Sequence, residues 1–270
     1  MNLALRGGGW PFGLEKWYID TLLPDGGVLL VYLARIRLFG LPIARLTAEL
    51  LRPGMEAVRG NAVVIHARGG EDSLVFGPCS IEGNVIRWHT AGLSGELSFV
   101  PRYGPVCLRA PFLASGRRCL LWTVEVPDAE VTGQLRWPGG QLAVCGRGYR
   151  DRVWFDLLPW RFPIRRLVWG RAVAGAHATT WVGVQTDTGA VADRWQDGSV
   201  GAGDGHPSAL GPSRVLVDTR VADIAGLRLG LLKPLLRRLT GDPREVKRAG
   251  PAEVAGVPGV SIHEVVEWDR

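Results

Sequence analysis

Short runs of β-branched and aromatic residues recur along the chain, separated by Gly, Pro and Asp. Apolar and polar residues alternate in the last run, where Ile262, Val265 and Trp268 are interspersed with His263 and Glu264. This period-two pattern predicts an all-β protein. The predicted strands are Val28–Leu38, Leu41–Leu51, Ala62–His66, Val85–His89, Leu93–Val100, Leu120–Val126, Leu142–Arg147, Arg166–Ala174, Thr179–Thr186, Arg214–Thr219 and Ser261–Trp268.

Turn-forming sequences separate several of these runs, at Pro24–Gly27, Pro53-Gly54, Pro138–Gly140 and Thr188-Gly189. So many strands, without helices between them, must close their sheets into barrels or packed sandwiches to protect the sheet edges. A barrel of about eight strands leaves room for one small ligand. The pattern therefore predicts a ligand pocket.

The chain has 270 residues, enough for two ordinary domains. Pro159 and Pro163 flank an aromatic and basic segment within Leu158–Ile164, which is typical of a linker. We therefore predict an N-terminal domain over residues 1–160 and a C-terminal domain over residues 161–270.

The segment Ile224–Leu239 departs from the β pattern, because a leucine recurs there at every fourth position. Pro234 interrupts the repeat. We predict a short helix, kinked or split at Pro234, that packs on the barrel. The alternative is a membrane-surface or partner helix whose polar face carries Lys233, Arg237 and Arg238.

Hydrophobic residues make up 46% of the chain and charged residues 21%, which places it in the globular range and away from disordered proteins. The chain contains 11 tryptophans. Because Trp buries a large rigid area and carries one N–H that needs a partner, this number indicates either a demanding core or an aromatic-lined ligand cavity.

The net charge is +6, but the basic residues are spread through apolar segments and match no nucleic-acid-binding module. We predict no nucleic-acid partner. The cluster of Arg161, Arg165 and Arg166 is interpreted as a solvated face, with an anionic membrane or an acidic substrate group as the alternative partner.

Cys79, Cys107, Cys119 and Cys145 form no Cys-x-x-Cys pair and match no zinc spacing, so they are interpreted as small apolar fillers in a reduced compartment. We expect no signal peptide, and the longest apolar stretch, Gly26–Leu46, is interrupted by arginines. A cytoplasmic location follows, with peripheral membrane contact as a further possibility.

No metal site or cofactor site is predicted. The five histidines are scattered without metal-ligand spacing, and the glycine-rich segment around His206 lacks the strand-to-helix context of a phosphate-binding loop. The sequence contains no serine nucleophile elbow and carries no indication of the oligomeric state.

Two segments resemble a known family. Residues 146–154, Gly-Arg-Gly-Tyr-Arg-Asp-Arg-Val-Trp, and the later Trp169-Gly170-Arg171-Ala172 are similar to the Gly-x-Gly-Tyr-His-Asp-His-Asn-Trp-Gly … Trp-Gly-Arg-Ala signature of the carotenoid 1,2-hydratase (hydroxyneurosporene synthase) and AttH-like family. Glu15–Tyr18 resembles the family's Glu-Trp-Trp-Tyr opening, and Leu120–Trp122 takes the place of its His-x-Trp segment. The resemblance covers most of the chain as far as Gly175.

The resemblance implies two lipocalin-like domains packed side by side. It also implies a hydratase that adds water across the terminal double bond of an acyclic carotenoid. Carried over by position, the implied catalytic residues are Asp151, Tyr149 and Trp122. The implied substrate-binding residues are Glu15, Trp17, Tyr18, Trp154 and Trp169.

Three family histidines are replaced, by Leu120, Arg150 and Arg152. Hydrating an alkene needs a carboxylic acid that an apolar site keeps neutral, and Asp151 is the candidate. Because side chains alternate along a strand, Tyr149 and Asp151 are expected on one face and to share the barrel lumen. Alternatively, Asp151 forms an ion pair with Arg150, Arg152 or Arg171, which would hold it charged and inactive as an acid.

These observations leave two hypotheses of different classes. The first is a hydratase-like or cyclase-like enzyme that binds a long apolar isoprenoid, polyene or polyketide in an aromatic-lined pocket and acts by protonation or by preorganising the substrate. The loss of the histidines is easier to reconcile with preorganisation than with strict hydration. The second is a lipocalin-like carrier of a hydrophobic small molecule, which binds its ligand without turnover.

Overall fold

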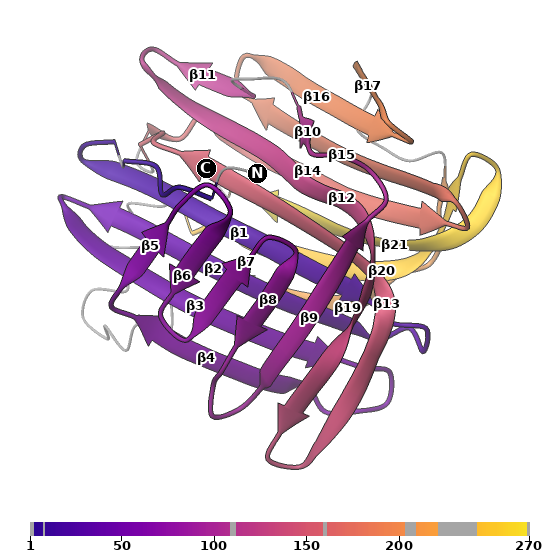
Figure 1. Ribbon diagram of the computed structural model, residues 1–270. Coiled ribbons are helices and arrows are strands. Elements are labelled where there is room, and N and C mark those ends of the chain that lie inside the picture. Colours follow the sequence, from indigo (N-terminus) through magenta and orange to yellow (C-terminus); the bar gives the residue numbers. More distant parts are fainter. Residues whose placement is uncertain are drawn as a thin grey trace. The chain divides into compact units, whose positions relative to one another are not determined.

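A computed structural model of the chain describes residues 3–7, 9–108, 112–158, 161–202, 209–220 and 242–268 (Figure 1). The elements in these ranges are β-strands joined by turns, which confirms the predicted all-β class. The chain divides into two compact units, Met1–Pro111 with Arg118–Asp156, and Phe112–Arg117 with Leu157–Arg270. The predicted helix over Ile224–Leu239 lies outside the described residues.

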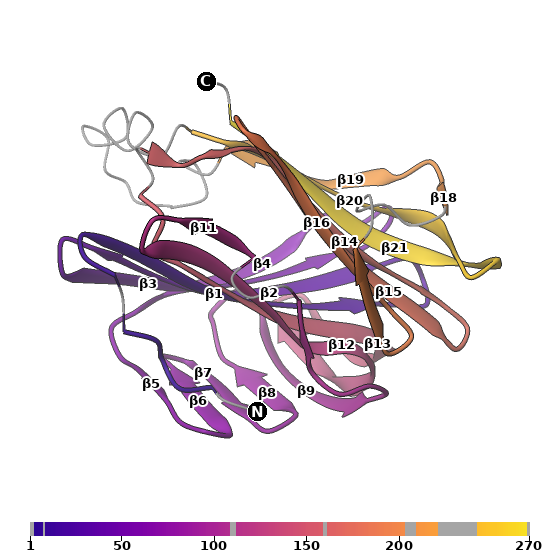
Figure 2. The same cartoon turned by 90° about the horizontal axis from the view of Figure 1, so that it is seen from above.

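The first unit is built on one antiparallel sheet that curls into a near-barrel (Figures 1 and 2). Its strands follow the order β4-β3-β2-β1-β13-β12-β9-β8-β7-β6-β5, and β10 also pairs with β12. The strands are β1 (Phe12–Leu22), β2 (Val28–Leu38), β3 (Leu41–Leu51), β4 (Val58–Val64), β5 (Ala67–Gly69), β6 (Ser73–Phe76), β7 (Cys79–Glu82), β8 (Val85–Trp88), β9 (Ser94–Pro101), β10 (Val106–Cys107), β12 (Arg118–Trp137) and β13 (Gly140–Phe155).

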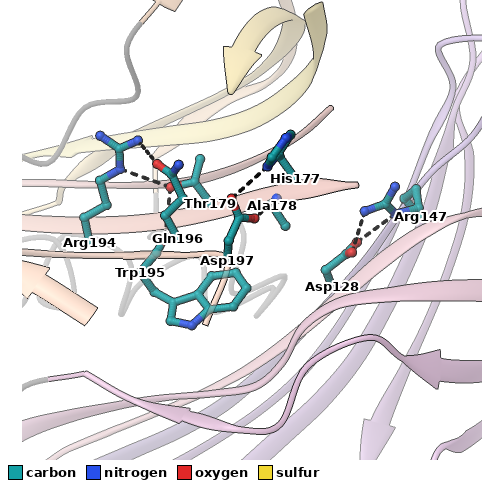
Figure 3. Close-up of polar contacts among 9 residues, drawn as sticks. All are labelled: Asp128, Arg147, His177, Ala178, Thr179, Arg194, Trp195, Gln196 and Asp197. Atoms are coloured by element: carbon teal, nitrogen blue, oxygen red, sulfur yellow. Dashed lines mark hydrogen bonds and ion pairs between the residues drawn. The ribbon is translucent and has the colours of Figure 1, made fainter. Parts of the chain in front are cut away.

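The β12–β13 hairpin turns at Pro138-Gly139, as predicted, but both strands are longer than predicted. Charged residues inside the hairpin interrupt the apolar pattern. One of them, Asp128, is fully buried and accepts hydrogen bonds from the Arg147 side chain across the hairpin, with Nε 2.8 Å from Oδ1 (Figure 3). This bidentate contact satisfies the hydrogen-bonding capacity of a buried carboxylate, whose burial the hydrophobic pattern of the sequence does not predict.

A hydrophobic cluster fills the first unit, and Trp17, Trp88 and Phe76 are among its largest members. The first unit also contains buried charged residues. Glu15 accepts hydrogen bonds from Nε of Arg152, at 3.1 Å, and from Nη2 of the same guanidinium, while Arg35 lies 3.7 Å from the other carboxylate oxygen. Glu15 is 3% exposed, so the pair is held without water to screen it.

The second unit carries another antiparallel sheet, which forms a half-barrel with the order β17-β16-β15-β14-β21-β20-β18, and β19 also pairs with β20 (Figure 2). Trp181 is the largest residue of a small core there, and Gly170 is the position that accommodates it. A Cβ on Gly170 would lie 2.3 Å from the Trp181 ring. The strands of this sheet are β14 (Ile164–Ala174), β15 (His177–Thr186), β16 (Gly189–Gln196), β17 (Ser199–Ala202), β18 (Ala209–Leu210), β19 (Arg214–Arg220), β20 (Arg244–Val254) and β21 (Val257–Glu267), whereas β11 (Leu113–Ser115) pairs with β12.

The four cysteines are free thiols whose environments range from buried to exposed. Burial raises the pKa of Cys79 to about 12, as expected of an apolar filler. Cys107 and Cys145 are exposed, so the filler interpretation is wrong for them. Within the described ranges no helix has the length and apolarity needed to cross a membrane.

Asp197, which directly follows β16, forms hydrogen bonds with the first residues of β15. Its carboxylate accepts a hydrogen bond from the Ala178 N–H at 2.8 Å and contacts Nδ1 of His177 at 2.9 Å (Figure 3). Burial acts to raise the pKa of Asp197, but these two contacts outweigh it and hold the pKa below its ordinary value of 3.8. The ionised carboxylate therefore stabilises the folded state.

We predict that Asp197→Ala lowers the free energy of unfolding by about 1–3 kcal/mol, because it leaves the Ala178 N–H without its acceptor. In the wild type this contribution is present above the unfolded-state pKa and is lost as the pH falls through the lower folded-state pKa. Denaturant unfolding between neutral pH and the acid range measures it. Asp197→Asn keeps an acceptor and lacks the acid-dependent loss, and equal acid sensitivity in wild type and Asp197→Asn would contradict the assignment.

We also predict that Glu15→Ala lowers the free energy of unfolding by about 3–5 kcal/mol, because it strands the buried Arg152 charge. The double variant Glu15→Leu, Arg152→Met recovers most of that loss, since a buried pair can be replaced by apolar groups of similar volume. Glu49→Ala is the matched control: Glu49 pairs with the exposed Arg59, and its loss costs at most about 1 kcal/mol. A Glu15→Ala effect no larger than this control would show that the pair is not buried in solution.

Candidate functional site

Strands β1, β12 and β13 lie side by side, and their register divides the residues near Asp151 between the two faces of the sheet. Tyr18 pairs with Asp151, and Trp17 pairs with Arg152. Because side chains alternate along a strand, one face carries Tyr18, Trp122, Tyr149 and Asp151, which we call the Asp151 face. The opposite face, which we call the core face, carries Trp17, Arg150, Arg152 and Trp154.

Asp151 is the centre of a hydrogen-bonded cluster on its face. The Tyr149 hydroxyl donates to Oδ2 of Asp151 at 2.9 Å, and the Trp122 indole N–H donates to the same oxygen at 3.1 Å. Tyr149 is 0% exposed, Asp151 1% and Trp122 6%. The structure thus brings together the three residues that the resemblance implied to be catalytic.

Tyrosine rings extend this cluster across β1 and β2. The Tyr18 ring centroid lies 6.1 Å from that of Tyr149 and 5.2 Å from that of Tyr32. The ammonium of Lys16 lies 5.0 Å from the centroid of the Tyr32 ring. The Asp151 face is therefore aromatic, and its rings can interact favourably with a positive charge.

Both hydrogen bonds end on one oxygen, which determines where Asp151 can carry a proton. Oδ2 accepts from Tyr149 and Trp122, so a neutral Asp151 places its acidic hydrogen on Oδ1. When that proton leaves, the two donors already in place bind the carboxylate that forms. The arrangement suits a carboxylic acid that gives up a proton and takes it back.

The glycine before Tyr149 has a packing reason. A Cβ on Gly148 would lie 2.3 Å from a methyl carbon of Val131 and 2.6 Å from the Phe99 ring, both in the core of the first unit. Any larger residue would displace β13 and move the Asp151 cluster with it.

The core face carries two ion pairs directly behind Asp151. Arg152 pairs with Glu15, and Nε of Arg150 lies 3.0 Å from Oε2 of Glu125. Since both arginines point away from Asp151 and have glutamate partners, the alternative in which they form an ion pair with Asp151 is wrong. The third arginine of that alternative, Arg171, belongs to β14 of the second unit.

The expectation that Tyr149 and Asp151 face the barrel lumen is also wrong. The core of the first unit contains Trp17 and Ile19 from β1, which alternate with Tyr18. The interior is therefore on the core face, and Asp151 lies on the other side of the sheet. Alternation predicted that Tyr149 and Asp151 share a face, but it could not say which face is inside.

The first unit has a cavity of about 170 Å³ on the core face. The residues that line it are Arg6, Pro105, Leu121, Thr123, Glu125, Arg152 and Trp154. Of the implied substrate-binding residues, Trp154 lines this cavity. Glu15 is hydrogen-bonded to Arg152, which is one of the lining residues. Trp17 is a core residue, and Tyr18 belongs to the Asp151 face.

Glu125 is a buried titratable group that the sequence interpretation did not single out. Burial raises the pKa of Glu125, and the charges of Arg150 and Arg152 only partly offset that effect. Burial also lowers the pKa of the Arg150 guanidinium, which the nearby Glu125 carboxylate counteracts. A charged residue between Val124 and Val126 was the only sequence signal for it.

Trp169, the fifth implied substrate-binding residue, lies in the second unit beside a buried charge cluster. The ammonium of Lys247 lies 4.7 Å from the centroid of the Trp169 ring, hydrogen-bonds to Glu264 and lies 3.9 Å from Glu245. Lys247 is 0% exposed. Sequence reasoning missed this cluster, because its members meet only through the pairing of β14, β20 and β21.

Among the described residues no three His, Cys, Asp or Glu side chains gather closely enough to hold a metal ion.

Comparison with known proteins finds similar folds among solved structures. A protein described as AttH from Nitrosomonas europaea is 15% identical, with a TM-score of 0.61 over 99% of this chain and 98% of that chain. CghA, solved with Sch210972, is 12% identical, with a TM-score of 0.58 over 100% of this chain and 95% of its own. Kievitone hydratase from Nectria haematococca is 12% identical, with a TM-score of 0.56 over 96% of this chain and 90% of its own.

No family model matches the chain, and no curated protein matches it. At 12–15% identity the solved structures establish the fold, and they do so over nearly the whole length of both partners. The predicted resemblance is confirmed at this level: the chain has the two-domain lipocalin-like fold shared by AttH, CghA and kievitone hydratase.

Proposed function

We propose that this protein is a hydratase-like or cyclase-like enzyme that acts on a long apolar isoprenoid or polyene, with Asp151 as the proton donor. The observation that carries the proposal is the convergence of the Tyr149 hydroxyl and the Trp122 indole N–H on one oxygen of the buried Asp151. A buried carboxyl with two fixed donors on one oxygen is preorganised for general acid chemistry.

The proposed reaction begins with proton transfer from Oδ1 of Asp151 to the less substituted carbon of the substrate's terminal double bond. The π electrons form the new C–H bond, a tertiary carbocation remains, and Asp151 becomes a carboxylate. In a hydration, water adds to the cation and loses a proton, which returns Asp151 to its acid form. In a cyclisation, an internal double bond attacks the cation and the ring product loses the proton, so the product is an isomer of the substrate.

The neighbours of Asp151 supply two forms of stabilisation. Tyr149 and Trp122 bind the carboxylate as it forms, and charge-assisted hydrogen bonds of this kind contribute more than neutral ones. The aromatic rings of Tyr18 and Tyr149 are placed to interact with the carbocation, at about 0.5–2 kcal/mol each.

The comparisons support this class of reaction at a coarse level, since one of the proteins with the same fold is, by its name, a hydratase. The residues that differ from the family signature shape the proposal further. Arg150 and Arg152 are engaged in ion pairs on the core face, and Leu120 is buried and apolar. None of the three can relay a proton, which leaves Asp151 to handle both proton transfers.

The same departures favour the second candidate function, a lipocalin-like carrier of a hydrophobic small molecule. A carrier needs an apolar binding surface and no proton relay. It retains the Tyr18 and Tyr149 rings as contacts for the ligand, and Asp151 then serves only to fix the orientation of Tyr149 and Trp122.

We predict that the wild type converts acyclic carotenoids or linear polyenes to products that have gained one water or kept their mass as isomers. Asp151→Asn lowers the rate by about 10²–10⁴-fold, since it removes the acid and keeps the shape. Tyr149→Phe and Trp122→Phe each lower it about tenfold, the equivalent of one hydrogen bond to a charged group. Mass analysis of bound and converted species after incubation with polyene extracts measures these changes.

The matched control is Asp187→Asn, an exposed aspartate of the second unit that pairs with Arg165. It leaves conversion unchanged. Conversion that survives Asp151→Asn would contradict acid catalysis by Asp151 and favour a cavity that acts by preorganisation. A ligand that is retained but never altered would favour the carrier.

A further inference from the structure

We propose that the cavity on the core face of the first unit is a separate binding site for a small carboxylate with a flat apolar body. It lies on the opposite side of β12 and β13 from Asp151, so the proposal does not depend on the enzymatic function proposed above. The site is formed by three layers of side chains from the two strands and by the N-terminal segment that carries Arg6.

The strand register builds these layers. Leu121 pairs with Trp154, and Thr123 pairs with Arg152, so the four side chains form two cross-strand pairs on the core face. The register then shifts between Val124 and Val126, which marks a β-bulge at Glu125. Glu125 lies two residues after Thr123, so strand alternation places its side chain on the core face with Leu121 and Thr123. Bulges occur often beside functional sites. The Glu125 carboxyl lies at the buried end of the cavity.

The outer end of the cavity carries a cation suited to an anionic ligand. The exposed Arg6 guanidinium lies 5.8 Å from the centre of the Trp154 ring, and none of the ion pairs in the described ranges involves it. The Arg6 N–H donates to Glu15 at 3.2 Å, which fixes the backbone that presents this side chain. Arg152, a second cation, lies deeper in the wall.

The balance of charge also favours an anion. Arg152 is paired with Glu15 and the Glu125 carboxyl with Arg150, so Arg6 is the cation of the wall that no ion pair in the described ranges neutralises. Because burial raises the pKa of Glu125, this carboxyl gains a proton more readily than an exposed one and can then donate an O–H to a ligand carboxylate. The Thr123 hydroxyl adds a neutral donor between the two ends.

The remaining residues that line the cavity determine which apolar group of the ligand fits. Trp154, Leu121 and Pro105 present aromatic and aliphatic surface. The volume of about 170 Å³ lies below the roughly 300–1,000 Å³ of cavities that hold drug-sized ligands. A single ring with one carboxylate therefore fits, and a long polyene does not.

The probe is benzoate, with benzamide and benzylamine as a neutral and a cationic analogue of the same shape. We expect ligand-observed NMR and calorimetry to show that the full-length protein binds benzoate and binds the two analogues more weakly. Arg6→Gln weakens benzoate binding by roughly 10- to 100-fold, the loss expected for a hydrogen bond to a charged group. The control Arg136→Gln, at an exposed arginine on the far part of β12, leaves it unchanged.

A second variant changes binding in the opposite direction. Glu125→Gln removes the negative charge at the buried end and keeps the side chain's size, so it tightens benzoate binding where Arg6→Gln weakens it. Because this change also removes the partner of the buried Arg150, thermal unfolding of each variant is measured first, and binding is compared at a temperature where both are folded. Opposite responses of these two variants, together with unchanged polyene conversion, would support the site. Equal binding of benzoate and benzylamine, or benzoate binding that neither variant changes, would overturn it.

Discussion

The antiparallel pairing of β1, β12 and β13 is the constraint on which the chemistry of the first unit depends. Side chains alternate along each strand, so pairing fixes which residues meet on each face. One register places Tyr18, Trp122 and Tyr149 around Asp151, and the same register places Trp17 and Trp154 around Arg152. A slip of one residue would exchange the two faces and destroy both arrangements.

The two faces solve the problem of buried charge in different ways. On the core face, Arg150 and Arg152 are balanced by Glu125 and Glu15, so that the interior of the near-barrel carries arginines without stranding them. On the Asp151 face, two neutral groups, the Tyr149 hydroxyl and the Trp122 indole N–H, donate hydrogen bonds to Oδ2 of Asp151.

Several features of this structure could be predicted from the sequence. Val28–Leu38 and Leu41–Leu51 agree residue for residue with β2 and β3, because a Pro24–Gly27 turn and long apolar runs define them. The β12–β13 hairpin was predicted at its turn and underestimated in length, since buried charges such as Asp128 and Arg147 interrupt its apolar pattern. The grouping of Tyr149 with Asp151 followed from alternation alone.

Other features could not be predicted, because they depend on contacts between distant strands. Which face of β13 points into the interior depends on the side of the sheet that the hydrophobic core occupies. The local sequence near Asp151 does not indicate which side that is. The contact of Glu125 with Arg150 depends on the pairing of β12 with β13, and the Lys247–Glu264 contact depends on the pairing of β20 with β21. In each case a charged residue inside an apolar strand was the visible signal.

The protonation state of Asp151 tests the central claim most directly, and isotope-edited infrared spectroscopy of the resting protein measures it. The difference spectrum between wild type and Asp151→Asn isolates this carboxyl from Glu125. We predict the C=O band of a protonated carboxylic acid at neutral pH, shifted in Tyr149→Phe because one hydrogen bond to Oδ2 is lost. A spectrum with only carboxylate bands for Asp151 at neutral pH would contradict its role as the proton donor.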